Sequence, residues 1–190
     1  LVAHGARNLT VIKNDANEPG MGIDHLLQNG QVTRLITTHL GLNGNAIALM
    51  NSGKLAVEFN AQGILAERIR AGGAGIGAIL SDIGIGTELA DGKQVVAMGN
   101  KDYVVEPALR ADVALIHADR ADSFGNLAYV ATARNFNPLM AMAADCVIAE
   151  AERVLPLGGL QADDVHTPGV FVDHVTALGE LSEEYAVVRR

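Results

Sequence analysis

Residues 32–60 read VTRLITTHLGLNGNAIALMNSGKLAVEFN, and this stretch decides the fold. The run Val32–Thr37 is rich in β-branched and apolar residues and predicts a strand. Asn45–Asn51 follows a helical spacing that closes at Ser52-Gly53, and Leu55–Phe59 predicts a second strand. A strand, a helix and a strand in succession indicate two parallel strands joined by a crossover helix.

The same alternation continues on both sides of this stretch. Further strands are predicted over Leu9–Lys13, Ile76–Leu80, Gln94–Met98, Tyr103–Glu106, Asp112–Ala118, Leu127–Val130, Cys146–Glu150 and Val170–Val175, and helices over Gly22–Asn29, Gln62–Ala71 and Pro138–Ala144. Gly99-Asn100-Lys101-Asp102 predicts a hairpin turn, and residues 182–190 suit either a tail or a strand. We therefore expect an α/β fold with an open, mostly parallel sheet and flanking helices.

The composition restricts the class of partner. The 190 residues include 14 Lys and Arg against 22 Asp and Glu, a formal net charge of −8. Such an acidic chain lacks the clustered cations that nucleic acid or an anionic membrane surface requires. The apolar run Leu139–Ala144 is far shorter than the roughly 20 residues of a membrane helix, so no membrane partner is expected.

Length and cysteine content complete this first reading. A chain of 190 residues suits one domain with a sizeable core, and a single domain over residues 1–190 is expected. The lone Cys146 excludes an intrachain disulfide framework and fits a reducing, cytoplasmic compartment. We expect it to be a buried strand thiol.

Several apparent motifs do not carry chemistry. Residues 73–78 read GAGIGA and fit the dinucleotide fingerprint, but a predicted helix precedes them and a predicted strand follows. A pyrophosphate site needs the opposite order, so we reject a nicotinamide site. The sequence contains no Walker-type loop and no G-x-S-x-G elbow. Its six histidines show no metal-ligand spacing, and no metal is expected.

Four other segments carry a family resemblance. They are residues 62–75 (QGILAERIRAGGAG), 118–127 (ADRADSFGNL), 132–138 (TARNFNP) and 166–173 (HTPGVFVD). In motif and in order they resemble the A (alpha) subunit of family I coenzyme A transferases of the 3-oxoacid, acetate or butyrate–acetoacetate type. The resemblance runs from about Asn8 to Asp173. It implies the open α/β fold that coenzyme A transferases share with sugar-phosphate isomerases.

The resemblance also implies a reaction and a partner. In this family, CoA moves from an acyl-CoA to a short-chain carboxylate such as acetate, butyrate, acetoacetate or succinate. A glutamate of the B (beta) subunit attacks the thioester and becomes a glutamyl-CoA thioester in a ping-pong mechanism. The E-N-G nucleophile motif of the B half does not occur here, so the nucleophile is expected on a partner B subunit, in an α2β2 assembly. CoA is then a substrate, and no permanently bound cofactor is expected.

Three candidate site residues follow from the same comparison. Gln62 matches the family glutamine that faces the reacting carboxyl groups, where an amide can donate to a developing oxyanion without competing as a nucleophile. Asn14 and Asp15 follow the first predicted strand, where a parallel sheet presents ligand-binding loops. Asn14 matches a family asparagine. Asp15 departs from the N-N version and resembles the acetate-type branch, and a turn-forming role for the pair stays open.

The glycines and charged residues of segment 62–75 could serve either the substrate or the packing of the helix. Gly72, Gly73 and Gly75 are candidates for CoA contact, or they allow close backbone approach. Glu67 is expected to pair with Arg70 at i,i+3 rather than act as a nucleophile. The family's A subunits also carry a glycine-rich CoA signature ahead of the segment aligned with Asn8. It does not occur in this sequence, so we expect an N-terminal segment to be missing.

Two alternative functions remain at this stage. A sugar-phosphate enzyme of the same architecture would need cations in an anion-binding loop, and none of the four lysines lies in a Ser/Thr/Gly-rich loop of that kind. A non-catalytic regulatory subunit would keep the fold and lose the reaction. A partner with an E-N-G motif distinguishes this second alternative from a transferase subunit.

Overall fold

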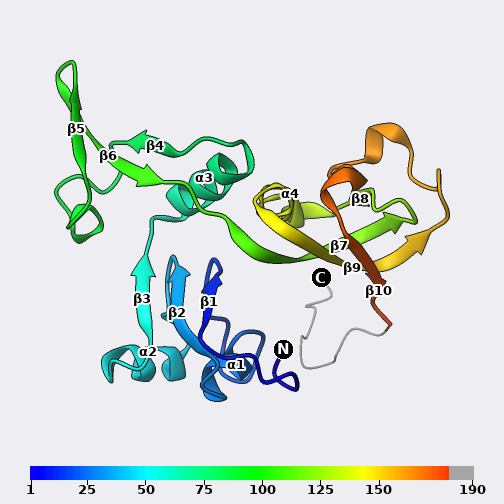
Figure 1. Ribbon diagram of the computed structural model, residues 1–190, viewed down its shortest axis with the longest axis horizontal. Coiled ribbons are helices and arrows are strands. Elements are labelled where there is room, and N and C mark those ends of the chain that lie inside the picture. The colour runs from blue at the N-terminus through cyan, green and yellow to red at the C-terminus, as the bar shows by residue number, and fades with distance from the viewer. Residues whose placement is uncertain (180–190) are drawn as a thin grey trace. The chain divides into compact units, whose positions relative to one another are not determined.

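The computed structural model describes residues 1–179, which divide into two compact units (Figure 1). Unit 1 comprises Leu1–Leu65 and Ser81–Val104, and unit 2 comprises Ala66–Leu80 and residues 105–179. The strands form three sheets, with orders β1-β2-β3, β10-β9-β7-β8 and β4-β6-β5. The α/β class with parallel strands and flanking helices is confirmed, although the strands are distributed over three sheets. The alternative fates of residues 182–190 lie outside the described residues.

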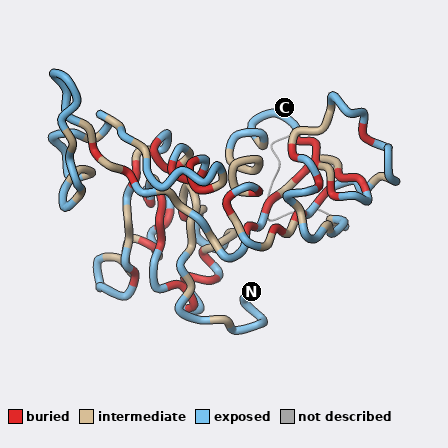
Figure 2. The backbone as a smooth tube through the Cα atoms, turned by 45° about the horizontal axis from the view of Figure 1, so that its top comes forward, coloured by how far each residue is buried: buried red, intermediate tan, exposed pale blue. Residues whose placement is uncertain are grey.

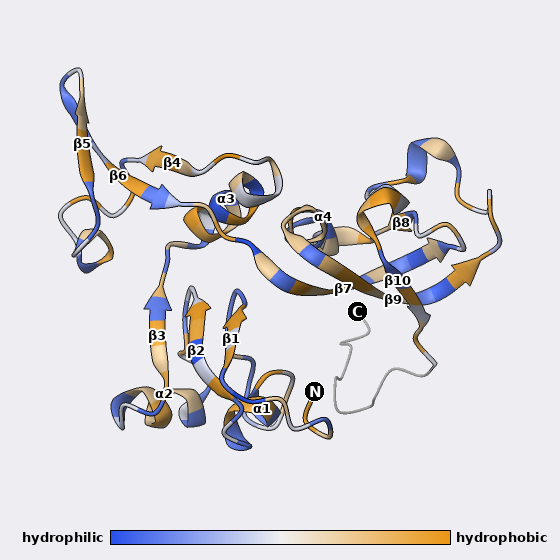
Figure 3. Cartoon of the chain, in the orientation of Figure 1, coloured by the Kyte–Doolittle hydropathy of each residue, from blue (hydrophilic) through white to orange (hydrophobic). Residues whose placement is uncertain are grey.

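The first sheet of unit 1 contains the stretch that decides the fold. It consists of β1 (Leu9–Ile12), β2 (Val32–Thr37) and β3 (Ala56–Phe59), all parallel. Helices α1 (Asp24–Gln28) and α2 (Gly44–Asn51) connect them, as the sequence predicts. Figure 3 shows that β1 and β2 are mainly hydrophobic, which is typical of parallel strands. The three arrowheads in Figure 1 lie at the same edge.

The core of unit 1 joins this sheet to its two helices. The buried cluster consists of Ala16, Leu26, Leu27, Val32, Leu35, Leu40, Ala46 and Leu55. Leu35 belongs to the central strand β2 and has no exposed surface, so it lies at the centre of this packing. The amphipathic spacing of α1 places Leu26 and Leu27 against the sheet, while its exposed residues face solvent.

A buried carboxylate links α1 to α2. Asp24 is fully buried and accepts hydrogen bonds from the backbone of Gly20 at 2.6 Å and from the amides of Asn43 at 3.0 Å and Asn45 at 3.2 Å. The Gln28 amide also donates to it. Burial alone would raise the pKa of Asp24, but these donors outweigh burial and hold its pKa below the ordinary value. The carboxylate is therefore the stable form in the folded state.

The second part of unit 1 is an antiparallel hairpin. Strands β5 (Val95–Met98) and β6 (Lys101–Pro107) pair with Val95 opposite Val104, which confirms the predicted turn. The neighbouring strand β4 covers Ala78–Ser81. Figure 2 shows that the hairpin is exposed along most of its length. Val104 in β6 is fully buried.

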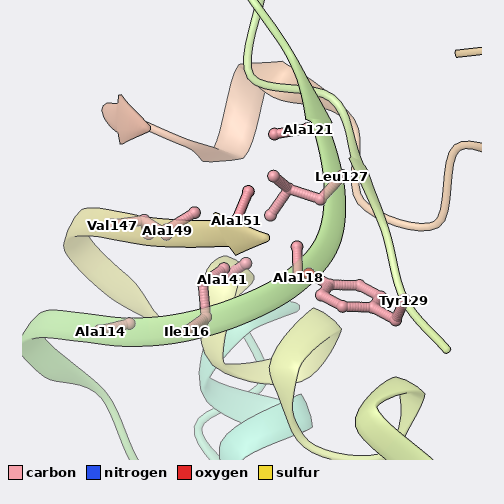
Figure 4. Packing of buried hydrophobic residues seen from close by; sticks show 10 residues of the cluster. All are labelled: Ala114, Ile116, Ala118, Ala121, Leu127, Tyr129, Ala141, Val147, Ala149 and Ala151. Atoms are coloured by element: carbon pink, nitrogen blue, oxygen red, sulfur yellow. The ribbon is translucent and has the colours of Figure 1, made fainter. Parts of the chain in front are cut away.

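Unit 2 is built around two long parallel strands. β7 (Ala111–Asp122) pairs with β9 (Ala144–Leu155), and each extends beyond the predicted range. β8 (Leu127–Ala128) is antiparallel to β7, and α4 (Asn137–Met142) covers one face of the sheet. The core in Figure 4 consists of Ala114, Ile116, Ala118, Ala121, Leu127, Tyr129, Ala141, Val147, Ala149 and Ala151. The alanines among them leave room for α4 to pack on the sheet.

The last strand of unit 2 begins later than predicted. The range Val170–Val175 is wrong at its start, because Gly169–Phe171 forms a 3₁₀ turn and β10 runs from His174 to Ala177. A Cβ atom on Gly169 would lie 2.5 Å from the Phe124 carbonyl oxygen, so the chain packs against another loop there. It enters the sheet at Asp173, whose backbone N–H donates to the Val147 carbonyl at 3.0 Å.

Three shorter features complete the fold. Other 3₁₀ turns cover Glu88–Ala90, Ala131–Arg134 and Ala162–Asp164. Cys146 lies in β9 as predicted, but it is half-buried rather than buried. Among the described helices, none has both the length and the apolar character needed to cross a lipid bilayer.

Replacing Asp24 tests the buried carboxylate. In Asp24→Asn, an amide NH₂ meets donors that previously met oxygen, so we expect the free energy of unfolding to fall by about 2–4 kcal/mol. Because the folded pKa is depressed, this stabilisation is present above the unfolded pKa of about 3.9 and is lost as pH falls through the folded value. Urea unfolding at pH 7 and below pH 4 measures both effects. The exposed Asp91→Asn is the control, and equal losses in the two variants would contradict the prediction.

Candidate functional site

The carboxyl ends of β1, β2 and β3 bring the candidate residues of unit 1 together. Asn14 and Asp15 follow β1, Thr38 and His39 follow β2, and Gln62 follows β3. Asp15 and His39 form an isolated parallel bridge beyond the strand ends. This edge is where a parallel α/β sheet binds ligands, because its loops and helix starts converge there.

Two of the predicted site residues are in direct contact. The Gln62 Nε2 donates a hydrogen bond to the Asn14 Oδ1 at 2.8 Å, although 48 positions separate the residues. Gln62 is exposed and is the first residue of α3 (Gln62–Gly73), and Asn14 is half-buried. The sequence motif and the strand-end argument thus lead to one pair of neutral amides.

The Asn14 backbone is held by two neighbouring threonines. Its carbonyl oxygen accepts from the Thr38 backbone N–H at 3.0 Å, the Thr38 hydroxyl at 2.6 Å and the Thr37 hydroxyl at 3.1 Å. The Thr38 Oγ1 also lies 3.3 Å from the Asn14 Oδ1. Three donors on one carbonyl fix the position from which the Asn14 side chain projects.

Asp15 contributes a negative charge that is already paired. Its Oδ1 lies 3.2 Å from the Lys13 Nζ and accepts from the Asn17 backbone N–H at 2.7 Å. Partial burial would raise the pKa of Asp15, but the Asn17 N–H, the Lys13 ammonium and the Asn14 amide together lower it. The Asn17 contact is also a turn interaction, so the structure supports the turn-forming role and leaves ligand contact a prediction.

Sequence reasoning missed Thr38 and His39. His39 is exposed, and its Nδ1 lies 3.5 Å from the Thr38 Oγ1. Both residues follow a correctly predicted parallel strand, so the argument that selected Asn14 would also have selected them. The hydrogen bonds of Thr38 to Asn14, 24 positions earlier, were not visible in the sequence.

Two of the candidate glycines allow close packing within unit 2. A Cβ on Gly72 would lie 2.0 Å from the Leu109 carbonyl oxygen, and one on Gly73 would lie 2.7 Å from the Met142 Cβ. The predicted end of the helix at Ala71, with Gly72 and Gly73 as its stop, is wrong, because α3 continues through Gly73. Their close-approach role is confirmed, and a contact with CoA stays a prediction.

The third glycine is the true end of α3. Gly75 has a φ of +72°, and the backbone N–H groups of Ile76 and Gly75 donate to the carbonyls of Ala71 at 2.9 Å and Gly72 at 3.4 Å. This pair of bonds is the Schellman motif, which requires a left-handed residue and favours glycine. Strand β4 then begins at Ala78, so the helix-before-strand order that excludes the dinucleotide fingerprint is confirmed.

The charged residues of α3 have partners of their own. The Arg70 Nε lies 2.9 Å from the Glu67 Oε2, which confirms the predicted i,i+3 pair. Arg68 is buried, and its Nε donates to the Pro107 carbonyl at 2.7 Å. Neither contact singles out an arginine for a phosphate group. Within residues 1–179, no group of three or more His, Cys, Asp or Glu side chains could hold a metal ion.

Comparison with known proteins shows the family of this chain. The family model described as Coenzyme A transferase covers residues 1–178. The chain belongs to the coenzyme A transferase family. A probable coenzyme A transferase subunit alpha from Bacillus subtilis is 52% identical over 172 residues, which is 90% of this chain and 75% of that protein. The acetate CoA-transferase subunit alpha of Escherichia coli K12 is 44% identical, over 92% of this chain and 80% of that protein.

A solved structure of the family agrees with the fold. An acyl-CoA transferase from Escherichia coli O157:H7, determined as a thioester complex with CoA, has a TM-score of 0.79 and 25% identity. The match covers 95% of this chain and 41% of that longer chain. These matches confirm the family and the fold that the four sequence motifs predict.

Two glycines of α3 provide a matched test of packing. We expect Gly72→Ala to lower the free energy of unfolding by about 2–4 kcal/mol, since the new methyl group meets a backbone oxygen that cannot turn aside. Gly63→Ala, in the same helix, meets no atom within 4 Å and should be neutral or stabilise by about 0.5 kcal/mol. Thermal and urea unfolding compare the variants. A stable Gly72→Ala protein with weakened CoA binding would instead favour the ligand role.

Proposed function

We propose that this chain is the alpha subunit of a coenzyme A transferase that moves CoA between an acyl-CoA and a short-chain carboxylate. A relative that is 44% identical is named acetate CoA-transferase subunit alpha, and acetate as a substrate agrees with the Asp15 pattern seen in the sequence. CoA acts as a substrate. The nucleophilic glutamate belongs to a beta subunit in an α2β2 assembly, and the single cysteine fits a cytoplasmic setting.

The hydrogen-bonded pair of Gln62 and Asn14 is the observation that carries this proposal. The Asn14 Oδ1 is occupied by one Nε2–H of Gln62, so the second Nε2–H and the Oε1 of Gln62 remain for other partners. An acyl-transfer step develops negative charge on the thioester carbonyl oxygen, and a preorganised N–H donor stabilises it. A neutral amide performs this task without becoming acylated itself.

The assignment of the nucleophile to a partner has a physical basis. An acyl-glutamyl anhydride hydrolyses readily, so it must form where water is excluded and the departing thiolate is retained. A nucleophile on one subunit and an orienting amide on another assemble such a site only where the two subunits meet. Relatives named as alpha subunits support a complex of this kind.

The Gln62 amide is tested by truncation. We expect Gln62→Ala to assemble with the beta subunit but to lose about 10²–10³-fold in kcat, the usual effect of removing one oxyanion donor. Steady-state transfer from acetyl-CoA, butyryl-CoA or acetoacetyl-CoA to acetate and succinate measures the loss. Gln94→Ala removes an exposed glutamine that precedes β5 and should leave the rate unchanged. Normal turnover by assembled Gln62→Ala would remove Gln62 from the site.

Trapping locates the nucleophile independently. After the assembly reacts with an acyl-CoA and no acceptor, borohydride reduction of the enzyme-bound thioester should label the beta subunit alone. Label on this chain would overturn the division of roles. Isomerisation of a sugar phosphate without CoA would favour the alternative enzyme class, and an inactive assembly with a normal partner would favour a regulatory subunit.

A further inference from the structure

A hydroxyl group at the end of β2 lies at the centre of the candidate site. Thr38 follows β2 and is half-buried, and its Oγ1 donates to the Asn14 carbonyl oxygen at 2.6 Å. The same Oγ1 lies 3.3 Å from the Asn14 Oδ1, so its single O–H is close to both the main-chain and the side-chain oxygen of one residue. Its other neighbour, the His39 Nδ1, is farther away at 3.5 Å, and the Asn14 carbonyl is therefore its main partner.

Two hydrogen bonds in succession connect this hydroxyl to the side-chain amide of Gln62. Thr38 holds Asn14, and the Asn14 Oδ1 accepts from the Gln62 Nε2 at 2.8 Å. Gln62 is exposed and has three side-chain torsions, so without this contact its amide would sample several rotamers. A side chain must hold its donor within about half an ångström to stabilise a transition state, and that requires a supporting shell.

We propose that Thr38 is a positioning residue for CoA transfer, acting through Asn14 to fix the orientation of the Gln62 amide. Thr37 does not take this part. Its hydroxyl also donates to the Asn14 carbonyl, at 3.1 Å. Within the described part of the chain, it makes no hydrogen bond to the Asn14 side chain. Thr37 thus supports the backbone, whereas Thr38 also sets the side-chain direction. The inference rests on the proposed function, because it gives Thr38 a role only if Gln62 faces the reaction.

Replacing the hydroxyl with a methyl group tests the proposal in the complete alpha–beta assembly. We expect Thr38→Val to lower kcat by about 10–100-fold while KM for acyl-CoA and for acetate stays within about twofold. Thr38→Ser keeps the hydroxyl and should restore kcat to within about threefold of the natural enzyme. Thr33→Val makes the same substitution at an exposed position of β2 and is the matched control.

A double-mutant cycle with Gln62 separates this proposal from the one on which it rests. If Thr38 acts through Gln62, then Thr38→Val adds no further loss in the Gln62→Ala background. Multiplying losses, or normal turnover in Thr38→Val when Gln62→Ala is slow, would overturn the role of Thr38 alone. Normal turnover in Gln62→Ala would overturn the assignment of Gln62 itself.

A second variant distinguishes a defect in folding or assembly from a defect in catalysis. If Thr38→Val fails to assemble with the beta subunit, Thr38→Ala makes the same comparison, because alanine also lacks the hydroxyl and removes rather than adds bulk. Failure of both variants to assemble would overturn the proposal, since Thr38 would then be required for folding rather than for positioning.

Discussion

The parallel pairing of β1, β2 and β3 is the constraint on which the candidate site depends. Parallel strands must all end at one edge, so three segments distant in sequence deliver their following residues to the same place. The ladder continues past the strands themselves: Thr38 N–H donates to the Asn14 carbonyl at 3.0 Å and Asn60 N–H to the Thr37 carbonyl at 2.9 Å. The site residues are therefore placed by the sheet rather than by flexible loops.

The chemistry at this edge is divided between neutral and charged groups. Gln62 and Asn14 form a pair of amides that can donate hydrogen bonds without titrating near neutral pH. The Asp15 carboxylate next to them is paired with Lys13, so its charge is partly cancelled before a substrate carboxylate arrives. Under the proposed function, an unpaired anion here would repel both the acceptor carboxylate and the oxyanion that develops in acyl transfer. The ion pair keeps the edge compatible with anionic partners.

Local patterns in the sequence predicted most of this structure. The bounds of β2 are those expected for Val32–Thr37, because its β-branched run is flanked by distinct helical spacing. β7 and β9 extend farther than predicted, since their charged ends lie where each strand is still paired with the other. The start of β10 was misplaced because a glycine packed against a distant loop outweighs the β-branched residues that follow it. Strand propensity is a property of one segment, whereas the bounds of β7, β9 and β10 depend on contacts between two segments.

The candidate site shows the same limit. Gln62 and Asn14 were found from a motif and a topological argument, but the Thr38 hydroxyl that holds Asn14 depends on the register between β1 and β2. A threonine after a strand is unremarkable until the neighbouring strand is placed beside it. Register is a property of paired strands, so a single sequence cannot supply it.

Helix α3 shows how one family motif can serve two physical purposes. Its first residue, Gln62, presents an amide, while Gly72, Gly73 and Gly75 near its other end serve backbone packing and the helix stop. The resemblance covers this whole segment and by itself leaves open whether the glycines contact CoA or allow close packing. The contacts assign only the first residue to the amide pair, because a Cβ at Gly72 or Gly73 would collide with unit 2 itself.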